Sequence, residues 1–217
     1  LSNLLPHELV GQLIDELDRR HGVVRDHVER FTLSCVGQTG AQGGHIGLVS
    51  KLQAALSDDV VVHTVNNYCV GGLTAVGNTA LAIRSGEADL ALAGGAAVRV
   101  PHGVGYQQID GTVTSPDGFC RPMDAAAEGT IFGSGVGLVL LAREDVVDRL
   151  GLTPRAWILG AAANNDGGDK ASFTASMTAV AAAAPSASSA PPPPPPAVGG
   201  GSFHGPGTRP RGSSTST

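Results

Sequence analysis

Residues 60–72 read VVVHTVNNYCVGG and are the most informative stretch of the sequence. The first six form a β-branched run of the kind found in a buried strand. A polar turn then leads to Cys69, and the Ala- and Gly-rich segment 70–85 that follows has the composition of a helix, which Gly86 would close. The stretch therefore predicts a strand that turns directly into a helix, with a cysteine at the turn.

A cysteine at this position has the features of a nucleophile. Unpaired amide N–H groups and the helix dipole at a helix N-terminus favour a thiolate, and the same N–H groups are available to an oxyanion. Gly71 and Gly72 leave room for a substrate or a neighbouring backbone beside the sulfur. A free cysteine is also often a small buried hydrophobic residue, so position alone leaves both interpretations of Cys69 open.

Outward from this stretch, apolar strand segments alternate with helical segments. The pattern predicts strands over residues 30–36, 60–65, 89–93, 136–142 and 156–162, and helices over residues 6–20, 43–56, 70–85 and 144–150. Alternation of this kind, with strands apolar on both faces, predicts an α/β layered fold.

The composition changes sharply near residue 178. Nine of the 14 prolines lie from Pro185 to Pro210, and residues 179–217 contain no Leu, Ile, Asp, Glu or Lys. Such a segment buries too little apolar surface to offset the entropy of ordering it. We therefore expect a truncated domain over residues 1–178 and a Pro/Ala/Gly/Ser-rich, low-complexity tail over residues 179–217, either disordered or translated out of frame.

Charge and cysteine content exclude several classes of protein. The 217 residues include 14 Lys and Arg against 19 Asp and Glu, and this net charge of −5 argues against nucleic-acid binding. No apolar run reaches the roughly 18–20 residues of a membrane span. Three cysteines without CxxC spacing argue against a disulfide framework or a zinc site, so we expect a cytoplasmic protein in which Cys35 and Cys120 are buried structural thiols. We expect no signal peptide, and the start at Leu1 indicates a fragment.

Long blocks of this sequence resemble the thiolase superfamily. The region around Cys69 resembles its nucleophile segment over residues 65–76, 82–89 and 92–95, and residues 35–44 resemble thiolases in particular. Downstream blocks resemble the β-ketoacyl synthase domain of modular polyketide synthases, over residues 101–106, 115–124, 128–137, 164–167 and 173–175. The resemblance implies a thiolase-like layered fold, α-β-α-β-α, of which this chain holds the N-terminal half.

The resemblance also implies a reaction. Cys69 would accept an acyl group from a thioester carried on the phosphopantetheine of an acyl carrier protein or on coenzyme A. A malonyl-type thioester would then lose carbon dioxide, and its carbanion would attack the acyl group, as in polyketide or fatty acid biosynthesis. The family implies no metal and no bound cofactor. It also implies a homodimer whose two-fold axis lies close to the nucleophile.

The β-ketoacyl synthases that this chain resembles also use two histidines, which belong to the second half of their domain. His204, in the segment HGPGT, is the candidate for the first, with Pro206 in place of a threonine, and the chain ends before the second. Tyr68 is bulky for its position and would narrow the acyl tunnel. Three interpretations follow: a β-ketoacyl synthase, a thiolase-like acetyl-CoA acyltransferase that works without decarboxylation, and a remnant that is acylated at Cys69 but does not condense.

Overall fold

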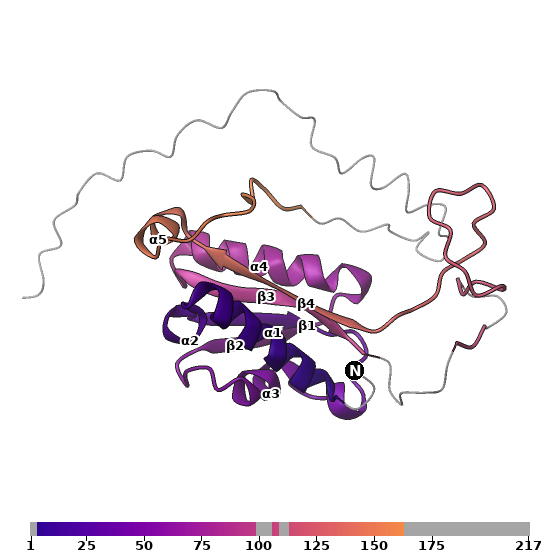
Figure 1. Ribbon diagram of the computed structural model, residues 1–217, viewed down its shortest axis with the longest axis horizontal. Coiled ribbons are helices and arrows are strands. Elements are labelled where there is room, and N and C mark those ends of the chain that lie inside the picture. Colours follow the sequence, from indigo (N-terminus) through magenta and orange to yellow (C-terminus); the bar gives the residue numbers. More distant parts are fainter. Residues whose placement is uncertain (1–3, 99–105, 109–112, 163–217) are drawn as a thin grey trace, which may run out of the picture. The chain divides into compact units, whose positions relative to one another are not determined.

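The computed structural model describes residues 4–98, 106–108 and 113–162. His204 and the whole of the predicted tail lie outside the described residues, as do residues 163–178 of the predicted domain. The elements, in chain order (Figure 1), are α1 (Pro6–His21), α2 (Val24–His27), β1 (Arg30–Ser34), η1 (Gly40–Gln42), α3 (Ile46–Gln53), β2 (Val61–Val65), η2 (Tyr68–Val70), α4 (Gly71–Ser85), β3 (Leu90–Ala97), β4 (Gly135–Ala142) and α5 (Glu144–Arg149).

Four strands form one mixed sheet in the order β2-β1-β3-β4. β1 runs parallel to both neighbours, with Phe31 opposite Val62 of β2 and Leu92 of β3, and β4 runs antiparallel to β3. Helices α1 and α3 pack on one face of the sheet and α4 packs on the other (Figure 1). The described elements therefore form a three-layered α/β/α unit, which confirms the predicted α/β class.

The main apolar core lies between the sheet and the pair α1 and α3. Phe31 and Leu33 of β1 are fully buried there, together with Val10 and Ile14 of α1 and Ile46 of α3. Because side chains alternate along a strand, the other residues of β1 face α4. The two faces of β1 thus bind two different helical layers.

The face of β1 toward α4 carries small polar side chains. Thr32 and Ser34 are buried there, and α4 meets the sheet with small buried residues of its own: Gly71, Ala75, Thr79 and Ala82. The approach is closest at Gly71, where an added Cβ atom would overlap Ser34 Oγ. Glycine at this position therefore lets the first turn of α4 rest directly on β1.

Gln42 joins the ends of β1 and β3. Its buried side chain donates from Nε2 to the Val98 carbonyl oxygen at 2.5 Å and accepts at Oε1 from the Val98 N–H at 2.8 Å. The Cys35 thiol lies 3.9 Å from the same Oε1 atom. The Gln42 side chain therefore serves as the hydrogen-bond partner of the Val98 backbone, just past the paired residues of β3. This contact holds together the end of the sheet where the parallel strands finish.

The structure corrects the prediction that residues 60–65 form a buried strand. β2 lies at the edge of the sheet with β1 as its one neighbour among the described strands, and Val61 is 51% exposed. His63 is exposed for the same reason. A β-branched run reports a preference for extended backbone, but it does not report how many strands will flank it.

Two other predicted elements also differ from the structure. Helix α3 covers only part of the predicted range 43–56, because residues 40–42 form the 3-10 turn η1 before it. Residues 156–162 form no strand, so that prediction is wrong. Apolar residues favour a strand only where a neighbouring strand supplies hydrogen bonds, and no described strand pairs with this segment, which leaves Trp157, Ile158 and Leu159 exposed.

The contact of α4 with β1 predicts opposite outcomes for two adjacent glycines. Gly71→Ala should lower the free energy of unfolding by about 1–3 kcal/mol, because the new methyl group overlaps Ser34 Oγ. Gly72→Ala should raise it by up to about 1 kcal/mol, because no atom lies within 4 Å of the added Cβ and alanine favours a helix. Urea unfolding measures both values. Equal effects of the two changes would contradict the packing described here.

Candidate active site around Cys69

Cys69 lies in η2, the single 3-10 turn that connects β2 to α4. β2 ends at Val65 and α4 begins at Gly71, so the sequence prediction of a cysteine between a strand and a helix is confirmed. The Cys69 side chain is exposed. The exposed thiol does not fit the alternative of a small buried hydrophobic residue.

The turn that presents Cys69 carries backbone strain. Tyr68 has a φ of 45°, in the left-handed region that costs a non-glycine residue about 1–3 kcal/mol. Its N–H donates to Asn66 Oδ1 at 3.2 Å, and Asn66 Nδ2 donates to the Val36 carbonyl oxygen at 3.4 Å. Asn66 therefore ties the turn to the segment that follows β1. Tyr68, which is bulky and directly precedes Cys69, is 73% exposed.

The two glycines after Cys69 have different surroundings. Gly71 is buried against Ser34, so it serves the packing of α4 on β1. Gly72 has no atom within 4 Å of the position of a Cβ, so it leaves open space beside the turn. Of the two predicted substrate contacts, Gly72 is the one with room for a ligand.

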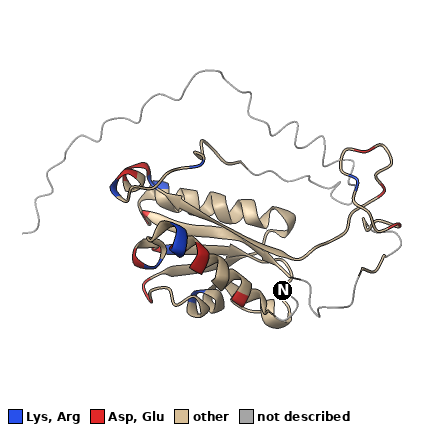
Figure 2. Cartoon of the chain, viewed as in Figure 1, with Lys and Arg blue, Asp and Glu red and all other residues tan. Residues whose placement is uncertain are grey.

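The electrostatic surroundings of Cys69 come from α4. The first turn of this helix has no acidic residue, and its one charged residue is Arg84 in the last turn (Figure 2). The dipole of a helix places positive partial charge at its N-terminus, and no carboxylate on α4 offsets it there. The end of α4 next to Cys69 is therefore suited to an anion or an oxyanion.

The other two cysteines differ from each other. Cys35 is buried, as predicted, and burial raises the pKa of its thiol. Cys120 is exposed, so the prediction of a buried thiol is wrong. Its Sγ atom lies 3.5 Å from Thr130 Oγ1 and accepts the Ile131 N–H at 3.0 Å, and these hydrogen bonds lower the pKa of the Cys120 thiol.

The loop around Cys120 is held by polar contacts, which is why that thiol is not in an apolar core. Asp117 accepts from Arg121 at 2.6 Å and from the Ser115 hydroxyl at 2.8 Å. Mainly because of Arg121 and then Ser115, the pKa of the Asp117 carboxyl falls from 3.8 to about 2. Arg121 thus pairs with Asp117, whereas Asp124 accepts the Ala126 N–H at 2.8 Å.

The two histidines near β2 have local roles. His45 Nδ1 lies 2.8 Å from Thr64 Oγ1 and accepts the Leu48 N–H at 3.2 Å at the start of α3. His63 Nδ1 lies 2.8 Å from Arg30 Nη2. His102 lies outside the described residues. Within the described ranges, no group of three or more His, Cys, Asp or Glu residues is arranged to hold a metal ion, and no helix there is long and apolar enough to cross a membrane.

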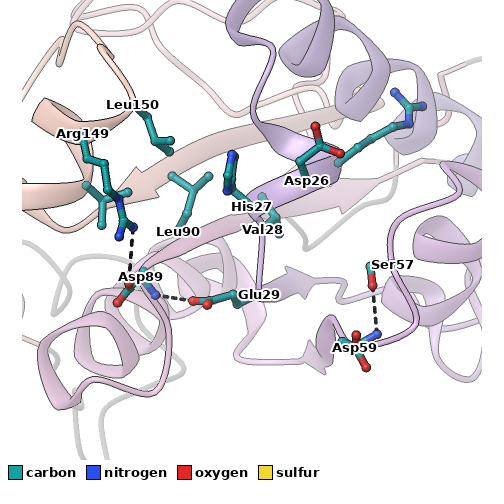
Figure 3. A pocket seen from close by; sticks show the side chains of 12 residues that line it. Asp26, His27, Val28, Glu29, Ser57, Asp59, Asp89, Leu90, Arg149 and Leu150 are labelled. Atoms are coloured by element: carbon teal, nitrogen blue, oxygen red, sulfur yellow. Dashed lines mark hydrogen bonds and ion pairs between the residues drawn. The ribbon is translucent and has the colours of Figure 1, made fainter.

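A cavity of about 250 Å³ lies at the end of the sheet where the parallel strands β1 and β3 begin (Figure 3). Glu29 and Asp89, which line it, directly precede the parallel strands β1 and β3, whereas Cys69 follows the carboxyl end of β2. Residues that line the cavity contact one another: Glu29 accepts the Asp89 N–H at 2.5 Å, and Arg149 lies 3.6 Å from the Asp89 carboxylate. The cavity is therefore separate from Cys69.

The Asp117 contacts predict a pH response of the loop. The folded pKa lies below the usual value, so closure of the loop is favoured above about pH 4 and is lost as pH falls through about 2. Arg121→Gln should move the Asp117 pKa up toward 3.8, because the largest stabilising contact is removed. NMR titration of the Asp117 carboxyl carbon measures it. An unchanged pKa in the variant would show that Arg121 is not the cause.

Two protein-family models match parts of this chain. Residues 1–99 match the family model of the thiolase N-terminal domain, and residues 59–146 match that of the β-ketoacyl synthase N-terminal domain. The two matches overlap across β2, the Cys69 turn, α4 and β3. The three-layered unit described above is thus a thiolase-like N-terminal domain.

Several curated relatives are bacterial polyketide synthases. A phenolphthiocerol/phthiocerol polyketide synthase protein of Mycobacterium tuberculosis is 46% identical over 115 residues, which are 51% of this chain and 8% of that protein. The spectinabilin polyketide synthase system protein NorB of Streptomyces orinoci is 42% identical over 104 residues, 48% of this chain and 5% of that protein. This chain thus spans less than a tenth of either relative. Residues 1–146 are thus similar to the N-terminal domains of thiolase-superfamily enzymes, and these relatives are polyketide synthases.

Proposed function

We propose that this chain carries the acyl-accepting half of a β-ketoacyl synthase that extends a polyketide or fatty acyl chain. The observation that supports this most is Cys69, an exposed thiol in a strained turn at the amino end of α4, whose first turn has no acidic residue. The names of its relatives, which are polyketide synthases, fit the same class of chemistry.

The proposed reaction has two stages. The Cys69 thiolate attacks the carbonyl carbon of an acyl thioester, and the tetrahedral intermediate expels the thiolate of phosphopantetheine or coenzyme A, which takes up a proton to become the thiol. Backbone N–H groups of the turn stabilise the oxyanion. A malonyl-type thioester then loses carbon dioxide, and its carbanion attacks the acyl-enzyme. A carbon–carbon bond forms as the carbon–sulfur bond to Cys69 breaks, so no metal or bound redox cofactor takes part.

The partners belong to the proposal as well. The acyl and malonyl groups would arrive on an acyl carrier protein, and His204 would stabilise the enolate of the malonyl-derived carbanion. A thiolase-like acyltransferase that uses coenzyme A thioesters is the second candidate, because residues 1–99 match the thiolase N-terminal domain. The third candidate, a remnant that is acylated without condensing, keeps Cys69 and lacks the second stage.

Products separate the three candidates. The 217-residue chain is incubated with an acetyl thioester and malonyl acyl carrier protein, or with acetyl-CoA alone. A β-ketoacyl synthase releases carbon dioxide from the malonyl group, a thiolase forms acetoacetyl-CoA from acetyl-CoA, and a remnant forms neither product. We expect a β-ketoacyl product, formed slowly by this chain, that Cys69→Ala abolishes and that His204→Ala lowers at least about tenfold, with acylation retained in His204→Ala. A product that persists in Cys69→Ala would contradict the proposal.

We also propose that the chain associates as a homodimer through β2. β2 is an edge strand whose outer hydrogen-bonding side has no neighbour among the described strands, and Val61 is half-exposed on it. A second β2 strand would satisfy these backbone groups and cover the apolar side chains. Sedimentation should give the mass of two chains, and Val61→Lys should shift the mass to one chain. A monomer at every concentration would contradict this assembly.

A further inference from the structure

Two polar side chains on either side of Cys69 form a hydrogen-bond relay. Asn67 Nδ2 donates to Thr74 Oγ1 at 2.8 Å, and Thr74 Oγ1 donates to the Val70 carbonyl oxygen at 3.1 Å. Asn67 lies two residues before Cys69, Val70 lies directly after it, and Thr74 belongs to the first turn of α4. A single hydroxyl, acting once as acceptor and once as donor, therefore joins both ends of the nucleophile turn to the helix.

The relay lies next to Tyr68, the residue of the turn with a strained backbone. The left-handed φ of Tyr68 persists only if surrounding contacts hold it. Asn66 holds the side of the turn that faces the segment after β1, and the relay holds the side that faces α4. The Asn67 side chain is exposed and contributes little to the apolar core, so its contact with Thr74 affects chiefly the local geometry of the turn.

We propose that Asn67 and Thr74 are positioning residues that hold the Cys69 thiol at the amino end of α4. This proposal rests on the proposed role of Cys69 as the acyl acceptor. Removal of the Thr74 hydroxyl would let the turn relax, and the sulfur would then spend less time beside the N–H groups of the helix. The reactivity of Cys69 should fall while the fold persists.

Iodoacetamide measures this reactivity without any thioester recognition, and peptide mass spectrometry follows each cysteine separately. Thr74→Val should slow alkylation of Cys69 about fivefold, the equivalent of about one hydrogen bond. Thr74→Ser, which restores the hydroxyl, should return the rate to within about twofold of the parent. Acyl transfer to Cys69 should slow in parallel. Alkylation of Cys120 should not change, and buried Cys35 should stay protected, which shows that the variant is folded.

Thr79→Val is the matched control. Thr79 lies in the same helix, and its buried hydroxyl finds no hydrogen-bond partner among the described residues, so the same change of side chain breaks no contact. It should leave the Cys69 rate unchanged. A Thr74→Val rate equal to that of Thr79→Val would overturn the proposal.

Asn67→Ala tests the relay from its other end and keeps the test valid if Thr74→Val exposes Cys35. The single change should slow Cys69 alkylation, and the double variant Asn67→Ala/Thr74→Val should be no slower than Thr74→Val, because both remove one shared contact. Independent, multiplying effects would overturn the relay. A parent chain that is alkylated at Cys69 but never acylated would instead contradict the proposed function and leave the positioning result standing.

Discussion

The close approach of α4 to the sheet determines where Cys69 lies. Gly71 rests on Ser34 of β1, and the buried small residues that follow on α4 keep the helix close to β1 and β3 along its length. Because α4 begins at that contact, the five residues between Val65 and Gly71 must turn within a short distance. The strained φ of Tyr68 and the exposure of Cys69 follow from this constraint.

Polar side chains also hold the end of the sheet where the parallel strands finish, next to the Cys69 turn. Gln42 joins Cys35 to Val98, and Asn66 joins the turn to Val36. Each takes the place of a backbone hydrogen-bond partner where the pairing of the described strands stops. At the other end of the sheet, charged residues such as Asp89 and Arg149 form ion pairs around a small cavity (Figure 3).

The sequence predicted most of the elements because periodicity and turn residues are local signals. Gly86 closes α4 with a φ of 80°, as its position after the helical segment indicated, and Cys69 lies at the predicted junction. The errors concern tertiary neighbours. The edge position of β2 depends on strand order, and the exposure of Cys120 depends on how Asp117 closes its loop. The Asn67–Thr74 contact joins residues seven apart, and only the turn into α4 brings them together.

The proposed role of Cys69 in this fold is to accept the acyl group. Its most direct test is to incubate the 217-residue chain with an isotopically labelled acetyl thioester, quench the reaction, and locate the label by peptide mapping. We expect one labelled acetyl group per chain, on the peptide that contains Cys69, with Cys35 and Cys120 unlabelled. Label on Cys120, or no label while iodoacetamide still modifies Cys69, would contradict it.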